Sequence, residues 1–373
     1  MLIKKIFNYS KLETNSTKRE ALHYIALMKF CAMILILRWH LYNWERRTID
    51  LGARMTEFLF ISSGFLVGYN YYQREMPATY EASFKYAYKH LRLFYPLHFI
   101  NSIYSFFHLR VKLNLTNYQM LILNFLMLKV WSSNKNYALG FNGISWFVSI
   151  LLFLYFLSPL LLQGIKTLKK SLIIFVFVAI TRYGIELLII KGSLNFMDFN
   201  FHRGPIIRAM DFYLGMLVIP LFIEIKNILD VIQNKFYLIY LFTIIQLLFP
   251  FIIYYIIFKY SYLGRKFFIF IFTASTFIIG FDYGIITNIV KKEICQKIMS
   301  CQMEMYLLHP DLNAILVKIF KILKKSWPKN RELNFLIKFL FVFINSYAYK
   351  KYLRNKLAVF MDKIVDLFKK IFE

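Results

Sequence analysis

Residues 21–40 read ALHYIALMKFCAMILILRWH, an apolar run broken only by a few ionisable side chains. A helix of about 20 mostly apolar residues is long enough to cross a bilayer, so the run predicts a membrane span. Residues 1–20 before it are polar and carry five Lys or Arg residues. No small-residue cleavage site follows a short apolar stretch, so we expect an uncleaved first span after a cytoplasmic N-terminal segment, 1–20.

The composition of the whole chain indicates the same class of protein. Of its 373 residues 59% are hydrophobic and 20% aromatic, which is more than soluble domains carry. The net charge of +27 would indicate a nucleic-acid partner in a soluble protein. Here the charges fall between long apolar runs, so we predict a polytopic membrane protein that contacts lipid and no nucleic acid. Cys31, Cys295 and Cys301 lack the spacing of a zinc site, and no metal is expected.

Further apolar runs extend this prediction along the chain. The candidate spans are 21–40, 55–72, 93–109, 144–162, 171–190, 205–224, 236–258, 266–289, 297–320 and 333–349. An eleventh run, 117–131, is short, and the distribution of Lys and Arg favours ten spans with both termini in the cytoplasm. The sequence therefore predicts an all-α, polytopic transmembrane helical bundle of about ten spans, with one membrane domain over 21–350 and a basic C-terminal tail, 351–373.

Ionisable residues in the first span are candidates for function, because such groups are costly in a bilayer. Lys29 and His40 are eleven residues apart, which is about 20° from three full helical turns. They share one helix face at a separation of about 16 Å. A histidine titrates near neutral pH and is a natural general base for a hydroxyl. The alternative is that Lys29 snorkels to the interface and His40 marks a helix end.

The second span, EFLFISSGFLVGYNYY, contains a GxxxG pair, Gly64 and Gly68. Such a pair lets another helix approach the backbone closely. Ser62 and Ser63 lie beside it and offer hydroxyls at one depth. Simple helix packing and a polar site both remain open for this segment.

A cationic stripe precedes the third span. Lys85, Lys89 and Arg92 follow i, i+4, i+7 spacing beside an apolar stripe, which predicts an amphipathic helix at the cytoplasmic interface. The stripe would bind anionic lipid or the phosphates of a soluble donor. Pro96 is expected to break this helix or to begin the next span.

Two later segments place polar side chains at or inside spans. NGISWFVS puts Trp146 and Ser149 at the start of a span, and MEMYLLHP puts Tyr306 and His309 on one helix face. Arg182, Glu186, Asp211 and Asp282 are further charges inside or near apolar runs, for which pairing and catalysis both remain open.

In this order the motifs resemble the acyltransferase-3 family, integral membrane O-acyltransferases that acetylate bacterial surface polysaccharides. The similarity covers about residues 20–350, which would make 21–350 an acyltransferase domain. The matching positions are Lys29 and His40, Ser63-Gly64-Phe65, the basic segment before Tyr95-Pro96, Trp146 with Ser149, and Tyr306 with His309. Departures are Lys29 in place of the family's Arg, a displaced pair of basic residues before Pro96, and Leu151 in place of an acidic residue.

The resemblance implies transfer of an acetyl group from acetyl-CoA, as a co-substrate, to a hydroxyl of a polysaccharide or its lipid-linked precursor in the bacterial inner membrane. No permanently bound cofactor is expected. His40 would be the general base, with Lys29 and Ser63 as the other catalytic residues. Donor phosphates would be held by Lys85, Lys89 and Arg92, and the acceptor by Trp146, Ser149, Tyr306 and His309. A flippase or exporter of lipid-linked sugar is the alternative, although the sequence shows no internal repeat. The oligomeric state stays open.

Overall fold

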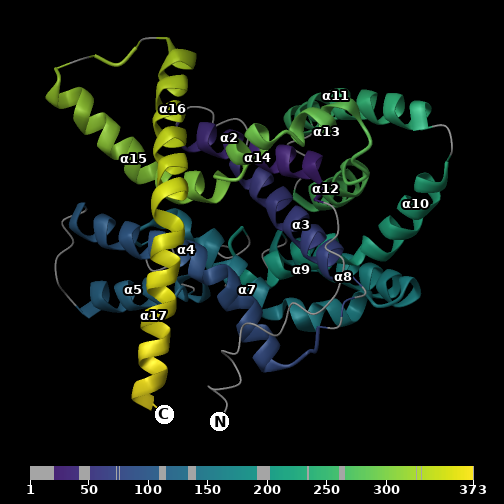
Figure 1. Ribbon diagram of the computed structural model, residues 1–373, viewed down its shortest axis with the longest axis horizontal. Coiled ribbons are helices and arrows are strands. Elements are labelled where there is room, and N and C mark those ends of the chain that lie inside the picture. The colour runs from purple at the N-terminus through teal and green to yellow at the C-terminus, as the bar shows by residue number, and fades with distance from the viewer. Residues whose placement is uncertain are drawn as a thin grey trace.

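The computed structural model describes residues 21–41, 51–72, 74, 76–108, 115–132, 140–190, 202–232, 235–259, 265–324, 326–328 and 330–372. The predicted cytoplasmic segment 1–20 lies outside this part of the chain. Every element in the described ranges is helical and none is a strand, which confirms the all-α class (Figure 1).

The helices follow the apolar runs of the sequence. In chain order they are α2 (His23–Leu41), α3 (Leu51–Tyr71), α4 (Tyr80–His108), α5 (Leu115–Phe125), η3 (Lys129–Trp131), η4 (Gly143–Ser145), α7 (Trp146–Leu161), η5 (Leu162–Ile165), α8 (Leu168–Ile190), α9 (Pro205–Leu217), α10 (Ile219–Val231), α11 (Lys235–Lys259), α12 (Arg265–Ile279), α13 (Ile285–Val290), α14 (Glu293–Met299), α15 (Gln302–Ile322), α16 (Arg331–Tyr349), the π-helical η8 (Lys350–Arg354) and α17 (Asn355–Phe372).

Five helical segments of the described chain are long and apolar enough to cross a membrane. They are His23–Leu41, Gly143–Ile165, Leu168–Leu188, Pro205–Val231 and Lys235–Lys259. The predicted spans 55–72, 93–109 and 333–349 are also largely helical: α3 covers the first to Tyr71, α4 covers the second to His108, and α16 contains the third. The predicted span 266–289 is not one helix, because α12 ends at Ile279 and α13 begins at Ile285.

The break between α12 and α13 has a structural role. Asp282 lies there with a positive φ of 59°, and its carboxylate accepts the backbone N–H groups of His23 and Tyr24, both at 2.9 Å. An acidic side chain at a helix N-terminus satisfies free N–H groups and favours the helix dipole. Asp282, a candidate charge in the sequence, therefore caps α2 from a distant segment.

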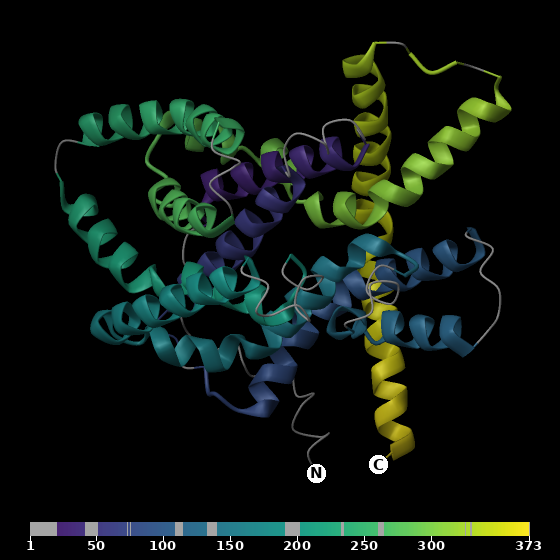
Figure 2. The same cartoon turned by 180° about the vertical axis from the view of Figure 1, so that it is seen from behind.

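Helix α3 lies at the centre of the molecule, between α2, α9 and α12 (Figures 1 and 2). Its GxxxG pair contacts α9 as expected. A Cβ at Gly64 would overlap the carbonyl oxygen of Phe212, and one at Gly68 would lie 3.2 Å from the Cα atom of Met216. From the other side, a Cβ at Gly215 would overlap the carbonyl oxygen of Ile61. The two backbones are thus in direct contact, which confirms the predicted close approach.

Gly64→Ala and Gly215→Ala are each expected to lower the free energy of unfolding by about 1–3 kcal/mol, because the added methyl group meets backbone that cannot rotate away. Gly184→Ala is the matched control, since a Cβ at this helical glycine meets nothing within 4 Å. Thermal melting of the purified variants measures the difference. Equal melting temperatures for Gly64→Ala and Gly184→Ala would contradict this packing.

Helix α4 is continuous for 29 residues and includes Pro96, so the predicted break at this residue is not observed. Neighbouring helices allow membrane helices to tolerate proline. The predicted C-terminal tail, 351–373, is also largely helical. Helix α17 continues from α16 through the π-helical turn and packs across α4 (Figure 2).

Candidate functional site

A cavity of about 220 Å³ lies where α2, α3, α7, α15 and the segment before α9 meet. Its lining residues are Trp39, His40, Gly52, Ala53, Thr56, Trp146, His202, Arg203 and Tyr306. Three of the predicted site residues, His40, Trp146 and Tyr306, are among them, although they are more than 100 residues apart in sequence. Of the described residues in this lining, none is acidic. We refer to this space as the central cavity.

The aromatic wall of the central cavity is held by backbone and ring contacts. The Tyr306 hydroxyl donates to the carbonyl oxygen of Ile144 at 3.0 Å, just before Trp146 begins α7. The Trp146 ring lies 5.0 Å from His202, and the Arg203 guanidinium lies 5.6 Å from the Trp146 ring centroid. Cations favour this position over an indole. The wall therefore combines flat apolar surfaces with a positive charge.

His40 stands at the cavity beside a second histidine. Its ring lies 5.0 Å from that of His309, and Trp39 contacts its edge at 4.8 Å. His309 is buried, and its Nδ1 lies 2.8 Å from the carbonyl oxygen of Tyr306. The structure thus brings the predicted residues of α2 and α15 into direct contact.

Lys29 and Ser63 form a pair of their own. The ammonium of Lys29 donates to the hydroxyl of Ser63 at 3.1 Å, joining α2 and α3. Neither residue lines the central cavity. The pair lies about three helical turns from His40 along α2, as the spacing predicts.

The cationic stripe of α4 is partly neutralised within the protein. Lys85 pairs with Glu81 at 2.6 Å, and Arg92 pairs with Asp362 of α17 at 3.1 Å. Lys89 is exposed. The stripe therefore exists as predicted, with a carboxylate from the C-terminal helix already on it.

Ser149 does not join the other predicted acceptor-binding residues. It is buried, and its hydroxyl donates to the carbonyl oxygen of Ser145 within its own helix at 3.0 Å. Conversely, the sequence interpretation missed Trp39, Thr56, His202 and Arg203 of the cavity lining. In the sequence, His202 and Arg203 are marked only as a His-Arg pair immediately before an apolar run.

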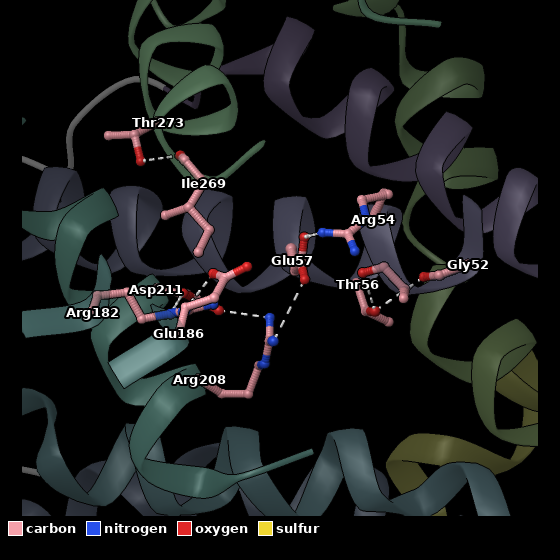
Figure 3. A network of polar contacts seen from close by, with 11 residues as sticks. Gly52, Arg54, Thr56, Glu57, Arg182, Glu186, Arg208, Asp211, Ile269 and Thr273 are labelled. Atoms are coloured by element: carbon pink, nitrogen blue, oxygen red, sulfur yellow. Dashed lines mark hydrogen bonds and ion pairs between the residues drawn. The ribbon is translucent and has the colours of Figure 1, made fainter. Parts of the chain in front are cut away.

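Figure 3 shows a chain of buried charges, of which Glu57 follows the cavity-lining residue Thr56 in α3. It alternates in sign, with the pairs Arg54–Glu57 at 2.7 Å, Glu57–Arg208 at 3.6 Å, Arg208–Asp211 at 2.6 Å, Asp211–Arg182 at 3.1 Å and Arg182–Glu186 at 3.1 Å. All six side chains are at most 9% exposed. We call these residues the ion chain; it ties α3, α8 and α9 together. Three positive and three negative charges leave it formally neutral.

Half of the ion chain was visible in the sequence as the charges Arg182, Glu186 and Asp211. The other half could have been found from spacing, because Arg54 and Glu57 are three residues apart and so are Arg208 and Asp211. Opposite charges one helical turn apart can pair within a helix. The sequence does not show which of these charges on different helices would contact one another.

No group of three or more potential metal ligands occurs among the described residues. The arrangement offers an imidazole and a guanidinium in one cavity, beside aromatic surfaces. Such a site can position a hydroxyl and accept its proton. A comparison with protein-family models, curated proteins and solved structures finds no match for this chain.

Proposed function

We propose that this protein is a membrane O-acyltransferase that transfers an acetyl group from acetyl-CoA to a hydroxyl of a cell-surface polysaccharide or its lipid-linked precursor. The observation that supports it most is that His40, Trp146 and Tyr306 line one cavity. These residues come from three of the motifs that carry the family resemblance. If the three motif matches were accidental, there would be no reason for their residues to line the same cavity.

We further propose ten spans with both termini in the cytoplasm of a bacterial inner membrane. Long-range pairs favour this arrangement, because each joins two segments assigned to the same side. The cytoplasmic pairs are Arg92–Asp362 and Gln163 with the Met76 carbonyl oxygen, and the outer pair is Arg38–Glu332. Helix α5 has only 11 residues, too few to cross a bilayer, which agrees with a run 117–131 that does not span.

This topology assigns the central cavity to the outer half of the membrane. His40 is near the outer end of α2, and Arg203 comes just before the outer end of α9. Lys29 and Ser63 belong to the inner half. The acceptor would therefore reach His40 from outside, and the thioester would arrive from the cytoplasm past the Lys29–Ser63 pair.

In the proposed reaction, His40 takes the proton of the acceptor hydroxyl as its oxygen attacks the thioester carbonyl carbon. The new C–O bond gives a tetrahedral oxyanion, and collapse of this intermediate breaks the C–S bond. The thiolate of CoA leaves and receives the proton from His40. Arg203 and Thr56, which line the central cavity with His40, are the groups available to stabilise the oxyanion. Lys29 and Ser63 lie about three helical turns from His40 and would contact the donor on its way to the cavity.

The central cavity is smaller than the roughly 300–1,000 Å³ typical of ligand pockets, so it would hold the reacting groups rather than the whole donor. The nucleotide end of the donor carries phosphates and suits the stripe formed by Lys85, Lys89 and Arg92. A phosphate on Arg92 would compete with the carboxylate of Asp362. Donor binding in this scheme therefore loosens the contact between α4 and α17.

Release of CoA distinguishes an acyltransferase from a carrier. Membranes containing the protein are expected to release free CoA thiol from acetyl-CoA when surface glycan is added, and to acetylate the glycan. A thiol reagent and mass spectrometry of the glycan measure the two products. Glycan movement across vesicles without CoA release would support the transporter instead.

A further inference from the structure

The turn Tyr306–His309 fixes the protonation pattern of a buried imidazole. His309 is 1% exposed, and its Nδ1 is 2.8 Å from the Tyr306 carbonyl oxygen. A carbonyl oxygen can only accept, so Nδ1 must carry the proton and donate it. In the neutral ring Nε2 then carries a lone pair.

That lone pair is buried and has no hydrogen-bond partner among the described residues. Buried acceptors without a partner are costly and therefore uncommon. The ring centroids of His40 and His309 lie 5.0 Å apart, and the two ring planes are inclined by 48°. Two imidazoles whose edges face each other across a hydrogen bond have about this separation. Because χ2 of histidine has broad wells, rotation of the half-buried His40 ring can close the bond.

We propose that His309 is a positioning residue for His40: its Nε2 accepts the N–H of the His40 ring. This bond fixes the tautomer of His40 and directs the lone pair of its other nitrogen into the central cavity. The inference rests on the proposed function, in which His40 is the general base. His309 would thus act like the third group in other nucleophile–base systems, which orients the base.

The pair also explains how His40 can hold a proton during the reaction. When His40 takes the hydroxyl proton it becomes an imidazolium, and its second N–H remains directed at the lone pair of His309. No proton moves to His309, whose own N–H stays on the Tyr306 carbonyl oxygen. The charge is stabilised without a buried carboxylate, in keeping with a described cavity lining that has no acidic residue.

Two substitutions separate this role from simple space filling. His309→Leu removes the acceptor and is expected to lower kcat by roughly 10²–10⁴-fold, while KM for acetyl-CoA changes less than about threefold. His309→Gln keeps a carbonyl oxygen near the position of Nε2 and is expected to recover about tenfold of the loss. Equal kcat for the two variants, or a rise in KM with kcat unchanged, would overturn the proposal.

A spectroscopic measurement tests the pair without using the reaction. The chain has seven histidines, and ¹⁵N-histidine solid-state NMR of the full chain in bilayers reports which ring nitrogen is protonated. His309, assigned by its loss in His309→Leu, is expected to be protonated at Nδ1 only, and the His40 signal is expected to shift in that variant. A protonated Nε2 of His309, or an unchanged chemical shift of the His40 signal in the variant, would contradict the inference. Absence of any CoA release by the wild-type protein would instead remove the proposed function, so the two failures are distinguishable.

Discussion

His40→Ala is expected to abolish acetate esters on the surface glycan of cells that carry only this variant. A general base contributes roughly 10²–10⁴-fold to the rate. No described acidic residue lines the central cavity, and its other imidazole, His202, packs on the Trp146 ring at 5.0 Å. At about 1.4 kcal/mol per factor of ten, the barrier would rise by about 3–5 kcal/mol. Mass spectrometry of the isolated glycan counts the esters directly.

Arg38→Ala is the control for this experiment. Arg38 lies in the same turn of α2, about 200° around the helix from His40, and pairs with the exposed carboxylate of Glu332 at 2.8 Å. This variant should retain the esters. Wild-type esterification in His40→Ala, at matched protein abundance, would remove His40 from the chemistry.

Arg208→Met is expected to lower the free energy of unfolding by about 3–5 kcal/mol. The guanidinium of Arg208 lies between Glu57 and Asp211 in the ion chain, and its removal leaves two buried carboxylates with less positive charge. Breaking a buried ion pair by removing one partner costs this much because the remaining charge stays desolvated. Thermal melting and the yield of monodisperse protein after detergent extraction measure the loss.

An exposed pair provides the comparison. Lys226 and Asp230 are four residues apart, with side chains 23% and 48% exposed, and such pairs contribute only about 0–1 kcal/mol. Lys226→Met should therefore melt close to the wild type. Adding Glu57→Gln to Arg208→Met should cost less than the sum of the two single changes. Full additivity, or equal melting of Arg208→Met and Lys226→Met, would show that the ion chain does not stabilise the protein.

The sequence predicted those features that depend on residues close together in the chain. Apolar runs predicted helices, and the Gly64–Gly68 spacing predicted a close helix contact that α9 supplies. The face shared by Lys29 and His40 follows from the helical period alone. Polar residues in an apolar run stand out for a physical reason, since each must find a partner or a ligand.

Contacts between distant segments were not predictable in this way. Nothing near Asp282 in the sequence indicates that it caps α2, and nothing near Asp362 indicates a contact with Arg92. The pairing of His40 with His309 depends on how α2 and α15 cross. Contacts between distant segments depend on how whole helices pack together, and every apolar residue contributes to that packing.

The contact between α3 and α9 has a practical consequence for genetic screens. Because Gly64 and Gly215 each face the backbone of the other helix, no residue larger than glycine fits at either position without moving a helix. A saturation mutagenesis scan would therefore score both glycines as essential, alongside His40. Protein abundance in the membrane distinguishes variants that disturb packing from variants that lose only activity. The glycine variants would be depleted there, while an inactive His40 variant would accumulate normally.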